Sequence, residues 1–547
     1  MDKSYKTRTI FIFLLFSSAY LIIALNLYLL QIRQNDFFKT LGKRQYNVQI
    51  TRHPARAPIF DRSGKQYLAM NKDCYSAFIL PKQLISEKQL LPFLQNHFPN
   101  ALQRFQKNKD KKFMFVQRKL KDNQISIIKE NNIEDIYLLK EPNRFYPLEA
   151  AGTVVGITDI DNKGLFGIEL QCDKTMTGKP TTFYLEKDAR SGHFHFKKET
   201  KIKGKKGKPI LLTIDSDLQF LAMEELQESI KQHNAKEGAV IIMDPKSGDI
   251  LSMVSYPYFD PNETQFLDLR TCKNKIITES YELGSVIKVF AALAAIDEEV
   301  VSLDEQIDCK GKKTAYIDGR KINTVKAHGL LSFSQVVEKS NNIGIAIVAK
   351  RVGEKLYKHY KKIGFGQKTN ITFPGEQKGF VNHPKNWSKQ SVISLSYGYE
   401  ISSTLLQLAK AFCIIARDGI AIQPTLILSN DKEESKKNNQ RIYKETSITK
   451  LKQILENTTL RGTARRARIK GYKVMCKTGT ANLLVDGKYS QDHNIFTCAG
   501  IVQKDNYQRV IITFLKEIDK KNVYSQTVVV PLFEKIAEKT LIHDKVI

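Results

Sequence analysis

The feature that most restricts this fold is a stretch of 21 residues without any charge, at positions 10–30. At about 1.5 Å per residue, a helix of this length crosses the roughly 30 Å hydrocarbon core of a bilayer. Lipid offers the backbone no hydrogen-bond partners, so a spanning segment must be helical. A cleaved signal peptide is the alternative, but the run is long for one, and residues 26–31 offer no small-x-small cleavage site. We expect an uncleaved anchor at 10–32 after a cytoplasmic tail at 1–9.

The chain carries a formal charge of +29, from 86 Lys and Arg against 57 Asp and Glu. Such a field favours anionic partners, among them nucleic acid and anionic polymers. No basic run is interleaved with aromatic residues as base stacking requires, so we expect no nucleic acid binding. The densest basic segment, residues 196–208, has two glycines and one aromatic residue, which is typical of a solvated linker.

The seven cysteines are scattered along the chain and odd in number. They form no Cys-x-x-Cys or Cys-x-His spacing, so the sequence predicts no metal site. An exported protein could pair some of them, such as Cys74 with Cys172. Buried free thiols are the simpler interpretation.

Two domains are expected after the anchor, because 547 residues exceed the size of one domain. Residues 33–205 mix short helix and strand patterns without catalytic spacing and are predicted to be a non-catalytic spacer. Residues 206–547 contain helical patterns and five strand patterns, at 238–244, 249–255, 472–477, 495–502 and 509–515. Strands in hairpin-like order with covering helices predict an α+β domain built on a five-stranded antiparallel sheet.

A serine and a lysine three residues apart, Ser285 and Lys288, open an apolar helical run at 289–296. Positions i and i+3 share a helix face, so Lys288 can reach back over Ser285 and accept its proton, which activates a serine nucleophile. Ser-x-x-Lys occurs four times in the chain, but only Ser285 opens a long apolar helix. Two unique motifs follow, Ser340-Asn341-Asn342 and Lys477-Thr478-Gly479, and the second ends a predicted strand. Their order fits one site assembled from a helix, a loop and a strand edge.

These three motifs form the signature of penicillin-binding proteins and class A β-lactamases. Nearly the whole chain resembles the class B penicillin-binding proteins, which are peptidoglycan D,D-transpeptidases. Its segments at 56–64, 144–147 and 164–169 are similar to the boxes of that family's spacer domain, and residues 239–262 to its first hairpin. The amino-acid sequence at 156–158, 386–388 and 396–399 is more similar to the division-specific, septal branch of the family than to the elongation branch.

The resemblance implies that Ser285 attacks the D-Ala-D-Ala carbonyl of a peptidoglycan stem peptide, that D-Ala leaves, and that an amine of a neighbouring stem attacks the acyl-enzyme. It further implies proton relay by Ser340, binding of the substrate peptide by Asn342, and an oxyanion hole from the backbone N–H groups of Ser285 and Thr480. The implied catalytic residues are Ser285, Lys288, Ser340, Asn342 and Lys477, and the implied substrate-binding residues are Thr478, Gly479 and Thr480. We expect Lys288 to be neutral, through burial and the charge of Lys477, and no cofactor to be needed.

The resemblance also implies a cellular setting. The chain would be a single-pass protein of the bacterial cytoplasmic membrane with its catalytic domain on the extracytoplasmic side. Residues 33–205 would be a pedestal or dimerisation-like domain. No glycosyltransferase domain precedes it, so a membrane glycosyltransferase and division proteins are the expected partners, with β-lactams as covalent inhibitors.

Three positions depart from the family pattern. Ala57 and Glu400 each stand where a glycine is usual, and Glu400 places a carboxylate where the family has none. Cys476 stands where a small glycine usually precedes Lys-Thr-Gly. A thiol there is expected to narrow the groove beside the strand edge.

Two alternatives to a transpeptidase stay open on the sequence. A carboxypeptidase or β-lactamase uses the same acylation but needs a base that activates water for deacylation. The Glu-x-x-Leu-Asn pattern of class A β-lactamases is absent. A non-catalytic division scaffold or β-lactam sensor is the second alternative, and the intact set of motif residues argues against it.

Overall fold

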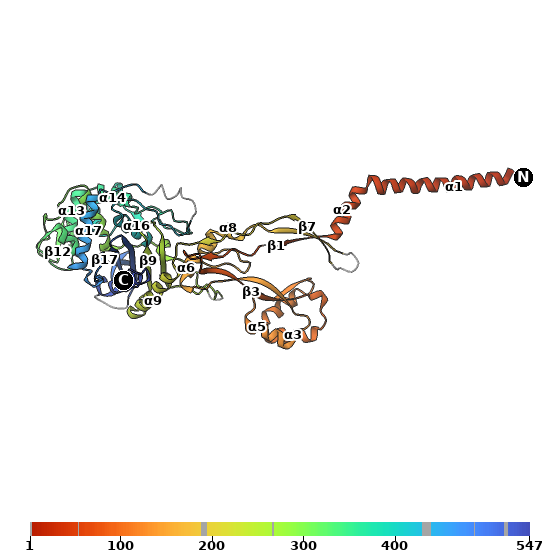
Figure 1. The fold of residues 1–547 in the computed structure, drawn as a ribbon, viewed down its shortest axis with the longest axis horizontal. Coiled ribbons are helices and arrows are strands. Elements are labelled where there is room, and N and C mark those ends of the chain that lie inside the picture. The colour runs from red at the N-terminus through yellow and green to blue at the C-terminus, as the bar shows by residue number, and fades with distance from the viewer. Residues whose placement is uncertain are drawn as a thin grey trace. The chain divides into compact units, whose positions relative to one another are not determined.

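The computed structural model describes residues 3–52, 54–187, 194–264, 267–428, 439–485, 487–518 and 523–546 of the chain (Figure 1). The chain divides into two compact units. One comprises Met1–Arg56 and Thr177–Gly207, and the other comprises Ala57–Met176 and Lys208–Ile547. The second unit contains all three sequence motifs.

The uncharged stretch lies in helix α1 (Lys3–Tyr28) and in the π-helical turn η1 (Leu29–Arg33) that continues it. Among the described helices, one, Tyr5–Arg33, is long and apolar enough to cross a membrane. None of its most apolar part is buried inside the protein, so its side chains are available to lipid. The predicted N-terminal apolar helix is therefore confirmed, and α2 (Asn35–Tyr46) follows it.

A three-stranded antiparallel sheet completes the first unit, with β6 (Thr181–Lys187) between β1 (Asn47–Arg52) and β7 (Phe194–Ile202). Strand β7 contains the first half of the lysine-rich segment, so the prediction of a linker is wrong for residues 196–202. Backbone pairing with β6 is the physical reason, because a paired neighbour can stabilise a strand whose composition favours solvent.

Residues 57–176, which lie within the spacer predicted at 33–205, form a lobe of mixed helices and strands. Its long strand β3 (Tyr67–Ile79) pairs with β2 (Ile59–Phe60), β4 (Met114–Gln117) and β5 (Tyr137–Phe145), and β8 (Ile210–Leu211) extends the sheet beside β2. Leu90, Phe93 and Phe105 pack with this sheet in a small core. The helices of this region are α3 (Glu87–His97), α4 (Pro99–Lys107), α5 (Asp122–Asn131), α6 (Gly152–Val155), α7 (Gly167–Gln171) and α8 (Asp173–Thr177).

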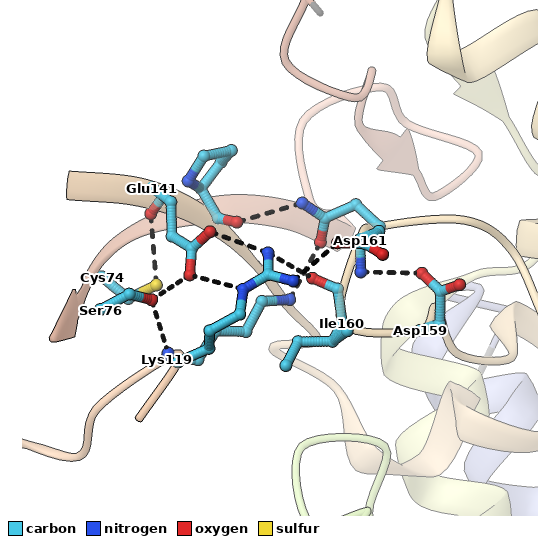
Figure 2. A network of polar contacts seen from close by, with 10 residues as sticks. Cys74, Ser76, Lys119, Glu141, Asp159, Ile160 and Asp161 are labelled. Atoms are coloured by element: carbon cyan, nitrogen blue, oxygen red, sulfur yellow. Dashed lines mark hydrogen bonds and ion pairs between the residues drawn. The ribbon is translucent and has the colours of Figure 1, made fainter. Parts of the chain in front are cut away.

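A polar network ties the loop at 159–161 to strands β3 and β5 (Figure 2). The Arg118 guanidinium pairs with Glu141 at 2.9 Å and with Asp161 at 2.7 Å. The Glu141 carboxylate also accepts a hydrogen bond from the Ser76 hydroxyl, and Cys74 Sγ donates to the Glu141 carbonyl at 3.2 Å. The network joins distant segments of the lobe and includes none of the motif residues.

A buried ion pair links two segments of this lobe that are distant in sequence. Arg144 Nε lies 2.6 Å from Glu169 Oε1, and the two side chains are 2% and 0% exposed. Because a buried charge without its partner is costly, each of these residues depends on the other.

The catalytic-domain sheet has five antiparallel strands in the order β10-β9-β19-β18-β17. This confirms the predicted five-stranded sheet. Its strands are β9 (Glu237–Met243), β10 (Ile250–Tyr256), β17 (Lys473–Val485), β18 (Lys488–Lys504) and β19 (Tyr507–Lys516). The prediction that Lys477-Thr478-Gly479 ends a strand is wrong, because β17 continues in pairing with β18 as far as Val485.

Helices cover both faces of this sheet, and side-chain alternation along the strands gives each face its own core. Ile241, Met475 and Ile512 pack on the face shared with α11 (Lys288–Asp297) and α16 (Leu405–Ala416). Ile242, Cys476 and Ile511 pack on the face shared with α9 (Ser216–His233) and α18 (Ser525–His543). The α+β architecture is thus as predicted.

The remaining elements of this domain surround the sheet. The helical ones are α10 (Lys275–Thr278), η4 (Gly284–Ile287), α12 (Phe333–Glu338), α13 (Asn342–Val352), α14 (Lys355–Ile363), α15 (Ser391–Ser396) and α17 (Glu445–Leu460). The short strands are β11 (Gln306–Asp308), β12 (Thr314–Ile317), β13 (Arg320–Asn323), β14 (Leu330–Ser332), β15 (Phe380–Val381) and β16 (Ile401–Ser402). None of the seven cysteines, all of which lie in the described residues, is in a disulfide, so Cys74 and Cys172 are not joined, and all but Cys74 are buried.

Candidate active site

Ser285 lies in the single turn η4, directly before α11. The turn begins at Gly284, whose φ of +58° is in the left-handed region that favours glycine. A Cβ at this position would also lie 2.6 Å from the carbonyl oxygen of Thr480 on β17. Within the described residues the half-buried Ser285 side chain makes no hydrogen bond, so its hydroxyl is free to react.

Lys288 is fully buried at the start of α11. Its Nζ lies 2.7 Å from the Ser340 carbonyl oxygen and 3.1 Å from Ser340 Oγ, and it contacts Asn342 Oδ1. Across the described parts of the chain, no hydrogen bond joins Nζ to Ser285. The expectation from i, i+3 spacing is therefore met only in part: Lys288 follows Ser285 on the same helical segment, but its amine faces the Ser340–Asn342 loop.

Ser340 occupies the turn between α12 and α13 with a φ of +54°. Its Oγ lies 3.1 Å from Lys288 Nζ and 3.0 Å from Lys477 Nζ, so one hydroxyl connects both lysines. The turn is fixed locally: Asn341 Oδ1 caps α13 by accepting from Gly344 N, and Asn342 Nδ2 donates to the Asn323 carbonyl oxygen at 2.6 Å.

Lys477 is the second fully buried lysine of the site. Burial, and then the charge of Lys477, hold the pKa of Lys288 well below its usual value. Burial lowers the pKa of Lys477 to about 8, although the neighbouring thiols Cys476 and Cys498 act to raise it. The burial of Lys288 and the charge of Lys477 thus both favour the neutral form of Lys288, which is the direction expected from the sequence.

Strand β17 is the edge strand of the sheet and carries Thr478, Gly479 and Thr480 beside η4. A Cβ at Gly479 would lie 2.5 Å from the Leu283 carbonyl oxygen and 2.7 Å from Val286 Cγ2. Glycine is therefore needed here for the packing of β17 against the chain's own nucleophile turn.

Two hydroxyl partners of this strand were not predicted from the sequence. Thr478 Oγ1 lies 3.2 Å from Thr463 Oγ1, and Thr480 Oγ1 lies 2.8 Å from Ser525 Oγ at the start of α18. Both partners come from other elements and carry no motif, so only the tertiary structure identifies them.

Cys476 does not narrow the groove, contrary to expectation. It is fully buried on the α18 face of the sheet, where its Sγ lies 3.5 Å from Thr459 Oγ1. Strand alternation places Cys476 on the side of the strand opposite to Lys477, and there the α18 core encloses the thiol completely, so it lines no groove.

These features together define an active-serine enzyme of acyl transfer, with a serine hydroxyl on a turn that packs against the edge strand β17 and two buried lysines joined through Ser340. Two family models match the chain: the penicillin binding protein transpeptidase domain over residues 238–538 and the penicillin-binding protein dimerisation domain over residues 51–212. The chain belongs to the penicillin-binding protein transpeptidase family.

Curated relatives match over most of their length. The probable peptidoglycan D,D-transpeptidase PenA of Neisseria meningitidis (strain Z2491) is 28% identical over 524 residues, which cover 94% of this chain and 89% of PenA. The peptidoglycan D,D-transpeptidase FtsI of Buchnera aphidicola subsp. Schizaphis graminum is 30% identical over 80% of this chain and 77% of its own. Penicillin binding protein 3 of Mycobacterium tuberculosis superposes with a TM-score of 0.69 at 24% identity, covering 91% of this chain and 98% of that one, which shows the shared fold.

Proposed function

We propose that this protein is a peptidoglycan D,D-transpeptidase that cross-links stem peptides through an acyl-enzyme on Ser285. The observation that carries the proposal is the Ser340 hydroxyl, held between a buried lysine whose pKa is strongly lowered and a second lysine that stays largely charged. A serine hydroxyl is a weak nucleophile and needs a neighbouring base, and a neutral Lys288 supplies one.

The reaction has two halves. In the first, Ser285 Oγ attacks the D-Ala-D-Ala carbonyl, its proton passes to Lys288, and the backbone N–H groups of Ser285 and Thr480 stabilise the oxyanion by about 3 kcal/mol per donor. D-Ala leaves as an amine after receiving a proton through Ser340. In the second half, the amine of a neighbouring stem attacks the ester, loses its proton to the same base, and releases Ser285.

Substrate binding is assigned to the edge of β17 and to Asn342. Lys477, Thr478 and Thr480 supply a positive charge and two hydroxyls for the terminal carboxylate of the donor peptide, a charge-assisted arrangement. Asn342 hydrogen-bonds the substrate backbone, after exchanging its present contact with Lys288.

The cellular role we propose is septal wall synthesis during division, supported by the similarity to FtsI and by the N-terminal helix. In this proposal residues 10–32 anchor the chain in the cytoplasmic membrane, 33–205 are a pedestal, and 206–547 form an extracytoplasmic transpeptidase domain. A membrane glycosyltransferase and division proteins are its partners, and β-lactams acylate Ser285.

Labelling with a fluorescent penicillin tests this function. The wild-type full chain in detergent is expected to become covalently fluorescent, and Ser285→Ala to remain unlabelled while it keeps the wild-type unfolding temperature. Covalent labelling of the Ser285→Ala variant would refute the enzymatic assignment. So would a strain that carries only Ser285→Ala and still divides. Rapid loss of the label from the wild type would instead identify a hydrolase.

A further inference from the structure

Glu400 has a backbone conformation that glutamate rarely adopts. Its φ is +60°, in the left-handed region. A side chain held at such an angle has a conformational cost, which is met when its own contacts outweigh it. The contacts of the Glu400 carboxylate therefore identify the segments that this side chain holds in place.

The Glu400 carboxylate lies between the end of β15 and helix α15. Asn382, which follows β15, donates from Nδ2 to Glu400 Oε2 at 2.6 Å and from its backbone N–H to the Glu400 carbonyl oxygen at 3.0 Å. The hydroxyls of Ser391 and Ser394 on α15, both buried, act with Asn382 to lower the pKa of this carboxylate against the effect of burial, and the Arg320 guanidinium donates to Ser394 Oγ. Glu400 is thus fixed to the end of β15, and its charge is stabilised from the side of α15.

The turn that Glu400 closes, Tyr397-Gly398-Tyr399, lies directly on the nucleophile turn. Gly398 has a φ of +96°, and a Cβ there would collide with the backbone of Gly284, the residue before Ser285. The Glu400 N–H also donates to Glu282 Oε1 at 3.1 Å, and Glu282 lies three positions before Ser285. Backbone contacts thus connect Glu400 to the position of Ser285.

The same turn contacts the β17–β18 hairpin on its other side. The Tyr399 and Tyr489 rings pack edge to face with centroids 4.7 Å apart, and Tyr489 Oη donates to Glu282 Oε2 at 3.0 Å. Tyr489 belongs to β18, the strand that pairs with β17. The turn therefore lies between η4 and the β17–β18 hairpin.

We propose that Glu400 is a positioning residue for acylation, whose carboxylate fixes the Tyr397–Tyr399 turn and thereby sets Ser285 against the edge of β17. The inference rests on the proposed function, because acylation of Ser285 is the step it serves. Small misplacements of reacting groups are costly in rate, so a loosened turn slows the covalent step more than it weakens the preceding complex.

The test is stopped-flow acylation of the full chain by a fluorescent penicillin, which separates the dissociation constant of the non-covalent complex from the acylation rate constant. Glu400→Gly suits the backbone angle but removes the carboxylate. It is expected to lower the acylation rate constant by about tenfold while the dissociation constant stays within about twofold. Glu400→Gln keeps an acceptor oxygen and is expected to restore most of the rate.

Two further variants sharpen the result. Glu299→Gly makes the same replacement at another left-handed glutamate (φ +57°), exposed beyond the far end of α11, and is expected to leave the rate unchanged. Asn382→Ala should slow acylation by itself but add little to Glu400→Gly, because both act through one contact.

A wild-type acylation rate in Glu400→Gly, a loss that appears in the dissociation constant alone, or a slow Glu400→Gln would each overturn the positioning role. These outcomes differ from failure of the proposed function, in which the wild type itself would not be acylated or Ser285→Ala would be labelled.

Discussion

The replacement Lys477→Met tests the electrostatic coupling on which the proposed chemistry depends. Lys288 Nζ and Lys477 Nζ lie 3.1 Å and 3.0 Å from the same Ser340 Oγ, so the two nitrogens are at most about 6 Å apart. At an effective dielectric constant of about 20, two unit charges at about 6 Å repel each other by about 3 kcal/mol. That energy corresponds to a factor of about 100 in the ratio of neutral to protonated Lys288.

The sign of the effect follows from the lowered pKa of Lys288. Its neutral, reactive form is populated above that pKa, so acylation rises with pH through it. Removing the charge of Lys477 raises the pKa, and the rising limb of the profile moves to higher pH. At pH 7 the rate falls by up to about 100-fold from this cause, and raising the pH recovers it. The wild type should also lose rate as pH rises through about 8, where Lys477 loses its charge, and the variant should not.

The assay is the second-order rate of acylation by a fluorescent penicillin between about pH 5.5 and pH 10. Lys477→Met also removes a substrate contact, which lowers the rate equally at every pH, so the position of the rising limb is the diagnostic quantity. Lys473→Met removes an exposed cation from the same strand and should leave that position unchanged. A rising limb shared by Lys477→Met and the wild type would refute the coupling, and a wild-type profile without a basic ionisation below pH 9 would refute the assignment of charges.

Three other replacements have defined outcomes. Gly479→Ala places a Cβ 2.5 Å from the Leu283 carbonyl oxygen and should reduce acylation at least about tenfold, since β17 must move away from the nucleophile turn; an unchanged rate would contradict the packing described. Cys476→Ala should lower the free energy of unfolding by about 1–2 kcal/mol, measured in urea, and leave acylation within about twofold. Arg144→Met leaves Glu169 buried without its partner and should destabilise the fold by about 3–5 kcal/mol, visible as a clear drop in unfolding temperature.

Sequence patterns were sufficient to predict those elements whose stability depends on residues close together in the chain. An uncharged run of 21 residues has one stable form in lipid, and alternating apolar residues gave the strands of the central sheet. The motif residues Lys288, Ser340 and Lys477 are brought together in the fold, because sheet order and helix packing place α11, the α12–α13 turn and β17 side by side.

What sequence reasoning missed depends on tertiary pairing. Beyond Thr480 the mostly apolar remainder of β17 is only five residues long and the returning residues 488–494 are mostly polar, so it is the pairing of β17 with β18 that makes both segments strands. The side of the strand to which Cys476 points, in contrast, could have been predicted from the sequence, because the direct neighbours of Lys477 on a strand must face the opposite side. The contacts of Glu400 join segments more than a hundred residues apart at Glu282, and no local pattern reports such contacts.

The hydrogen bonds of Ser340 give the proposed proton path a direction. A charged Lys477 can only donate, so the Ser340 oxygen accepts from it, and the Ser340 proton is left for another acceptor. A neutral Lys288 has one lone pair and two protons, and the two further oxygens at its Nζ, the Ser340 carbonyl and Asn342 Oδ1, take those protons. The lone pair then faces Ser340 Oγ, which explains why the Ser285 hydroxyl has no partner among the described residues. Lys288 must therefore turn from Ser340 to Ser285 when the donor peptide binds, and its return delivers the proton, by way of Ser340, to the departing amine.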